Sequence, residues 1–164
     1  MRALRYLYVL ALVMWLGGMS TAGFVVAPAT FATLEGWHPT TGRVLAGQVF
    51  GAVLARLHLM AYVAAALMML ALTSQRILGP RPHPYGLRMA LIGFMLAATV
   101  YSGAVLAPQI DRLQAGMSGP MTQLPLDDPR RTSFDRAHRW STALITATIA
   151  GGLLLLVWES REHA

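Results

Sequence analysis

Four long stretches without a charged residue constrain this chain more than any other feature of its sequence. They cover residues 6–34, 59–75, 89–110 and 140–158. A helix needs about 20 apolar residues to cross the hydrocarbon core of a bilayer, with a range of about 17 to 25. Lipid offers no partners for backbone polar groups, which favours helices over open strands. The sequence therefore predicts an all-α integral membrane four-helix bundle in one domain, with spans at about 6–34, 57–75, 88–110 and 140–158.

Composition supports a membrane environment and argues against two other classes of protein. Charged residues make up 12% of the chain, about half the share usual in soluble domains. All 13 basic residues are arginines that lie between the apolar stretches, which is typical of a membrane protein and not of a nucleic-acid-binding groove. The chain has no cysteine, so disulfides, thiolate metal sites and a cysteine nucleophile are excluded.

The first stretch and the distribution of arginine predict the topology. A secretory signal has an apolar core of about 7 to 15 residues, so the much longer first stretch is interpreted as a retained span. With four spans, both termini share a side with the short connection Arg76–Arg88. That side has the denser arginines, whereas those on the other side are spread out and mixed with aspartates. The positive-inside rule then places both termini in the cytoplasm.

Two segments between the spans allow less definite predictions. Val44–Ala55 is apolar but too short to span a bilayer, so it is either an interfacial amphipathic helix or an extension of the second span. Gly116–Pro129 is rich in Gly, Pro, Ser and Asp and is predicted to be a loop.

A weak internal repeat appears when the chain is compared with itself at an offset of 80 residues. Gly23–Pro28 matches Gly103–Pro108, and Arg56-Leu-His58 matches Arg136-Ala-His138. Both matches fall at equivalent places in the two predicted hairpins, which indicates two parallel-repeated helical hairpins related by an axis along the membrane normal. Each proline follows a pair of small residues suited to close helix packing and is expected to bend or end its helix.

His58 and His138 are the strongest candidates for a functional site. An ionisable group near an apolar helix is costly unless it faces the bundle or water. Two equivalent imidazoles are able to ligate a haem b iron axially or to hold copper; alternatively, each histidine caps a helix end. Arg56 and Arg136 cannot share a helix face with these histidines. They are expected to reach towards lipid phosphates, or to contact an anion or a haem propionate.

Catalytic signals are missing from the sequence. The ten methionines are interpreted mainly as core residues, and no metalloprotease motif, phosphate loop or catalytic triad spacing is present. An enzyme is therefore not supported. The spans are also expected to contain no buried Asp or Glu, which argues against an ion-coupled transporter.

Several motifs resemble those of the transmembrane protein 205 family and its bacterial relatives, which share a domain of unknown function. They are Trp15-Leu-Gly-Gly18, Ala27-Pro28 with Phe31, Gly47-Gln-Val-Phe50, Ala107-Pro108 and Phe134-Asp-Arg-Ala-His138-Arg-Trp-Ser141. The first helix also resembles that of CopD-type copper-resistance membrane proteins. The resemblance implies four transmembrane helices, a bacterial inner membrane and no settled activity.

Three functions are compatible with these observations. A non-catalytic accessory or scaffold protein ranks first, with a membrane-protein partner or a second copy of the chain as its partner. A haem b- or copper-binding protein that uses His58 and His138 ranks second. A small-solute transporter ranks third.

Overall fold

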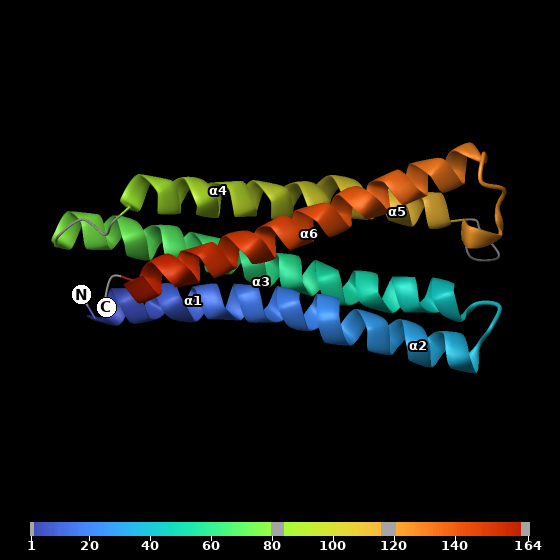
Figure 1. Cartoon of the computed structure of the whole chain (residues 1–164), viewed down its shortest axis with the longest axis horizontal. Coiled ribbons are helices and arrows are strands. Elements are labelled where there is room, and N and C mark those ends of the chain that lie inside the picture. Colours follow the sequence, from blue (N-terminus) through green and yellow to red (C-terminus); the bar gives the residue numbers. More distant parts are fainter. Residues whose placement is uncertain (1, 80–83, 116–120, 162–164) are drawn as a thin grey trace.

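The computed structural model describes residues 2–79, 84–115 and 121–161 and contains four long antiparallel helical rods (Figure 1). The rods, in chain order, are α1 (Arg2–Thr21), η1 (Ala22–Val26) and α2 (Ala27–Trp37); α3 (Gly42–Leu78); α4 (Tyr85–Tyr101), η2 (Ser102–Leu106) and α5 (Ala107–Gln114); and α6 (Pro129–Arg161). A short 3₁₀ turn, η3 (Met121–Gln123), precedes α6. No strand occurs in the described residues.

Each rod is long and apolar enough to cross a membrane, so the predicted all-α membrane bundle is confirmed. The rods hold 36, 37, 30 and 33 residues and extend beyond the charge-free stretches at both ends. The apolar segment 44–55 is the start of α3, which makes it an extension of the second span. Pro129 opens α6, where its missing amide hydrogen costs nothing. Part of the predicted 116–129 loop, residues 116–120, lies outside the described residues.

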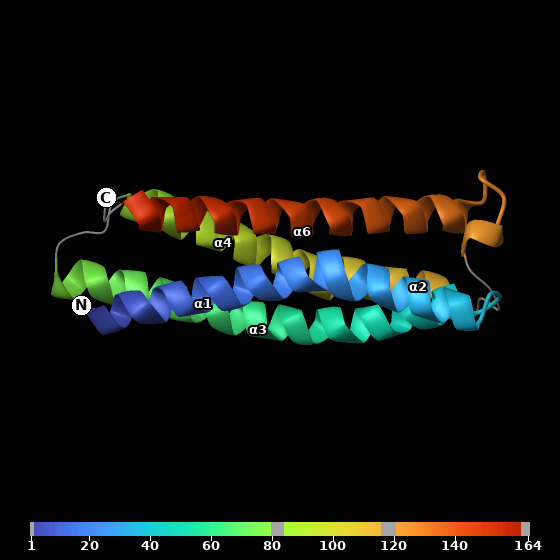
Figure 2. The ribbon, with the colours of Figure 1, turned by 60° about the horizontal axis from the view of Figure 1, so that its bottom comes forward.

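The rods form two layers that cross at an angle (Figure 2). One layer contains α1–α2 beside α3, and the other contains α4–α5 beside α6. The start of α1, the end of α6, the end of α3 and the start of α4 lie at the same end of the bundle (Figure 1). We call this the terminal end, and the opposite end, where α2 and α5 finish, the distal end.

The duplication predicted from sequence is present in the structure. Both π-helical segments, η1 and η2, occupy the same positions 80 residues apart. Many of the buried positions also coincide at this offset. The pairs in the first helices are 8/88, 12/92, 15/95, 19/99 and 22/102, and those in the second are 61/141, 68/148, 71/151 and 72/152. The two hairpins therefore use the same helix faces to build one common core.

Neither proline ends its helical rod, so of the two outcomes expected from sequence, a bend or an end, the end is wrong. Each proline stands in the first turn of a resumed α-helix, α2 or α5. In the π-helical turn before it, the Ala27 amide donates to the Ala22 carbonyl and the Ala107 amide to the Ser102 carbonyl. This wider turn gives the proline ring room at the place where an α-helix would crowd it.

Small residues let the rods approach closely, both within a layer and between layers. A methyl group on Gly151 would lie 3.0 Å from Met95 Sδ, and one on Gly152 would lie 3.2 Å from Leu16 Cδ1. Trp15 and Leu12, both fully buried, lie at the centre of the core cluster. The middle of the bundle is thus packed tightly by direct side-chain contacts.

Candidate functional site

A groove runs along one side of the bundle between α3 and the η2–α5 segment. Its volume is about 580 Å³, within the usual range of ligand pockets. On α3 it extends from Gln48 to Tyr62, which is about 21 Å at 1.5 Å per residue. The full lining is Gln48, Gly51, Ala52, Leu54, Ala55, His58, Leu59, Tyr62, Gly103, Ala104, Ala107, Pro108 and Asp111.

Gly103 allows the two walls to meet at the inner end of the groove. A methyl group at this position would lie 2.7 Å from His58 Nδ1 and 3.0 Å from Tyr62 Oη. Both side chains therefore converge on the same point of η2. They come from consecutive turns of α3, four residues apart, and so share one helix face. The absence of a side chain at Gly103 is what permits this close approach.

His58 carries an unsatisfied polar atom. The residue is 4% exposed, and its Nε2 atom is buried without a hydrogen-bond partner among the described residues. Leaving a buried polar group unpaired costs about 1 to 3 kcal/mol, and such groups are uncommon in native proteins. His58 thus combines a place in the groove lining with an unused hydrogen-bonding atom.

The charge of the groove is unusual for so basic a chain. Of the lining residues, Asp111 alone is charged at neutral pH with histidine neutral, and none is an arginine. Glycine and alanine provide six of the thirteen lining residues, three on each wall, which leaves a groove with small, largely apolar sides. The arrangement favours an uncharged or cationic molecule over an anion.

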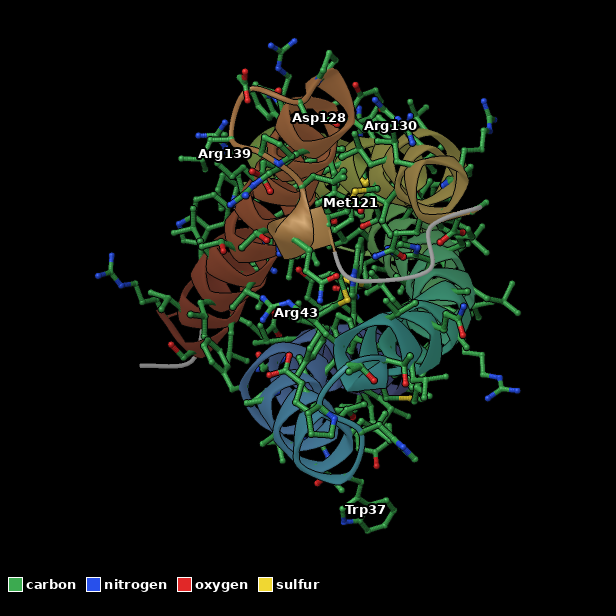
Figure 3. All side chains as sticks on the ribbon, turned by 90° about the vertical axis from the view of Figure 1, so that its right-hand side faces the viewer. Trp37, Arg43, Met121, Asp128, Arg130 and Arg139 are labelled. Atoms are coloured by element: carbon green, nitrogen blue, oxygen red, sulfur yellow. The ribbon has the colours of Figure 1, made fainter. Side chains whose placement is uncertain are left out.

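The internal repeat shows that packing alone does not require this lining. At the equivalent positions of the other hairpin, Leu59 is replaced by Arg139, Ala55 by Asp135 and Ala104 by Phe24. Arg139 lies at the periphery of the distal end, on the outer side of α6 (Figure 3). Phe24 is 74% exposed, and a methyl group at Gly23, the equivalent of Gly103, would meet no atom within 4 Å. The small, uncharged walls are therefore particular to one of the two repeats.

The two predicted histidines lie in different environments. His138 is exposed and stacks on Phe134, with ring centroids 6.0 Å apart. It does not line the groove, and neither do Arg56 and Arg136, which are also exposed. Within the described part of the chain, no group of three or more His, Cys, Asp or Glu side chains is placed to hold a metal ion.

A buried ionic cluster at the terminal end was not predicted from sequence. Glu159 accepts hydrogen bonds from Arg88, at 2.8 Å, and from Arg5. Arg88 is 1% exposed, and its guanidinium also lies over the ring of Tyr8, 5.9 Å from the ring centre. The predicted spans themselves hold no carboxylate, but α6 continues past the last of them, and Glu159 is buried one residue beyond its end. The signal available in the sequence was a single carboxylate one residue past an apolar stretch, on the predicted side of the membrane that also carries several arginines.

The fold and the groove define a class: an integral membrane bundle of four helices, built from two related hairpins, with a lateral groove between α3 and η2–α5. The model of a family described as a domain of unknown function (DUF4149) matches residues 10–118. This match covers more than half of the chain, which therefore belongs to that family. No curated protein and no solved structure matches the chain.

Proposed function

We propose that this protein is a non-catalytic accessory protein of the membrane that binds a lipid-soluble molecule in the groove between α3 and η2–α5. The observation that carries the proposal is the buried His58 imidazole, which lines the groove and whose Nε2 atom has no hydrogen-bond partner among the described residues. A ligand in the groove with a hydrogen-bonding group would give this imidazole a partner. The groove opens sideways between helices, so entry from the bilayer needs no pore.

Mass spectrometry of molecules that copurify with the protein tests this function. We expect an organic extract of the purified chain to contain a small molecule at near-stoichiometric amounts. The Ala104→Phe variant should lose it, because the new ring fills the groove. Phe24→Ala is the matched control, since it changes the equivalent position of the other repeat, and it should retain the molecule. Identical extracts from all three proteins would contradict the proposal.

The haem and copper alternatives have less support from the geometry. His58 and His138 do not line a common site, and the groove offers no arginine for haem propionates. Copper would require further ligands that the described residues do not gather. We expect a purified sample, expressed with haem and copper supplied, to show no haem bands in oxidised or dithionite-reduced spectra and no stoichiometric copper. Haem or copper that is lost in both His58→Ala and His138→Ala would restore this alternative.

The transporter alternative has less support from the packing of the described residues. The contacts of Gly151 with Met95 and Leu91 fill the region midway along α4 and α6. A conduction path would need polar groups and space at this depth.

The orientation of the chain is also part of the proposal: a bacterial inner membrane with both termini in the cytoplasm. Because the chain has no cysteine, single cysteines report sidedness without background. We expect a membrane-impermeant maleimide added to intact spheroplasts to label Gln123→Cys at the distal end and not Ser160→Cys at the terminal end, both exposed positions. Labelling of Ser160→Cys alone would reverse the orientation; detergent permeabilisation, which should expose both, is the control.

We also propose that the chain is related to the transmembrane protein 205 family and to CopD-type proteins. This part of the proposal rests on the motifs described for the sequence. Trp15 of the first motif lies in the core, and Gly18 packs against Met60. These placements give the motif a structural role. A second copy of the chain or another membrane protein is the expected partner of an accessory protein.

A further inference from the structure

We infer that the ligand of this groove is a flat, uncharged ring lipid with ring oxygens, of the quinone or quinol type, held by hydrogen bonds to His58 and Tyr62. This inference rests on the proposed function and specifies the chemistry of its ligand. Three properties of the groove lead to it: shape, charge and the position of its hydrogen-bonding groups.

The shape favours a flat molecule. Gly51, Ala52 and Ala55 form one wall, and Gly103, Ala104 and Ala107 form the opposite one. The small side chains on both walls bring the surface of the groove close to the two helix backbones, which suits a planar ring better than a branched headgroup. Leu54, Leu59 and Pro108 extend the apolar surface along the groove, where an isoprenoid chain would lie.

The charge excludes the common anionic molecules of the membrane. A phospholipid phosphate or a haem carboxylate would enter a groove that holds Asp111 and no arginine, although the chain carries 13 basic residues. Like charges at close range disfavour binding, and an anion here would lose its hydration without gaining a cationic partner. An uncharged molecule is subject neither to charge repulsion by Asp111 nor to the uncompensated loss of hydration.

The hydrogen-bonding groups match the two oxidation states of such a ring. The phenolic hydroxyl of Tyr62 is able to donate to a carbonyl oxygen. The Nδ1 atom of His58, which faces Gly103 in the groove, is able to donate to a quinone carbonyl in one tautomer and to accept from a quinol hydroxyl in the other. His58 lies one residue before the charge-free stretch 59–75 and Tyr62 lies within it, so both side chains are close to the predicted start of the second span.

Photoaffinity labelling in liposomes tests this inference with the full chain. The probe is an azido-substituted ubiquinone analogue, and the competitor is decylubiquinone. Tryptic fragments separate the two walls, because cleavage at Arg43, Arg56, Arg76, Arg88 and Arg112 gives fragments 44–56, 57–76 and 89–112. We expect labelling in these fragments that excess decylubiquinone abolishes.

Three variants and two matched controls establish where the probe binds. Ala104→Phe should reduce the competable labelling to background, because the added ring occupies the groove. His58→Leu should weaken binding about tenfold, the equivalent of one lost hydrogen bond, and Tyr62→Phe should weaken it by a similar or smaller factor. Phe24→Ala and His138→Leu alter the equivalent positions of the other repeat and should bind the probe like the original protein.

The results separate this inference from the function on which it rests. Labelling that decylubiquinone does not displace, or that is equal in Ala104→Phe, overturns the quinone assignment. If a copurifying molecule still depends on Ala104, the groove binds another ligand and only the ring chemistry is wrong. Competition by a sterol at equal concentration would likewise mean that the groove binds a ligand other than a quinone. If neither the probe nor any copurifying molecule depends on Ala104, both proposals fail.

Discussion

Replacing Glu159 by glutamine is expected to lower the free energy of unfolding by about 3 kcal/mol, the usual cost of removing one partner from a buried ion pair. Arg88 is almost wholly buried and would lose its carboxylate partner. Glutamine preserves the size of the side chain, so the loss reports the charge. Thermal and denaturant-induced unfolding in detergent micelles, followed by circular dichroism, measures the effect.

Glu35→Gln is the matched control for this prediction. Glu35 pairs with Arg43 at 3.3 Å, but both side chains are exposed, and exposed pairs contribute about 0 to 1 kcal/mol. We expect its unfolding curve to stay close to that of the original protein. An equal loss in the two variants would mean that the cluster of Arg5, Arg88 and Glu159 is no more important than a surface pair. The cluster would then contribute little to holding α1, α4 and α6 together.

Replacing Gly42 by alanine is expected to cost about 2 to 3 kcal/mol, in the range of a severe packing clash. A methyl group here would lie 2.0 Å from the backbone oxygen of Leu34 and 2.9 Å from Cα of Glu35. Because the obstacles are backbone atoms, no side-chain rotation relieves them. The turn between α2 and α3 would have to open, which would weaken the bond from the Gly42 amide to the His38 carbonyl.

Hydrogen exchange localises this second effect, and Gly36→Ala is its control. We expect faster amide exchange over residues 34–45 in Gly42→Ala, together with a lower midpoint of unfolding. A methyl group at Gly36 would meet no atom within 4 Å, and helical alanine is favoured over glycine by about 1 kcal/mol. Gly36→Ala should therefore be as stable as the original protein or more so. Unchanged exchange in Gly42→Ala would contradict the prediction.

The fold was largely predictable because its determinants are local. Uninterrupted apolar length predicts a span regardless of its neighbours, and the clusters around Gly23–Pro28 and Gly103–Pro108 indicated the duplication. Helix ends were less predictable. The rods continue through charged segments such as 129–139, where packing between rods, and not apolar length, decides whether the helix persists.

The candidate site was predictable only in part, for physical reasons. His58 was found because an ionisable group near an apolar stretch is costly wherever it points. The groove beside it was missed, since glycine and alanine walls look the same in sequence as ordinary helix contacts. The pairing of Arg88 with Glu159 joins residues 71 positions apart, and no pattern along the chain specifies such a contact. The difference in burial between His58 and His138 likewise depends on tertiary packing.

The two π-helical turns also indicate how this chain evolved. Each turn adds about one residue to an otherwise α-helical path, and at 3.6 residues per turn one residue rotates everything beyond it by about 100°. Deleting one residue from a single π-helical turn would thus rotate the whole helix beyond it, α2 or α5. The extra residue is therefore hard to gain or lose without other changes in packing. Both copies carry it at the same place. The simplest history is that an ancestral hairpin already had the insertion, and that the two descendants diverged afterwards in their side chains while they kept its geometry.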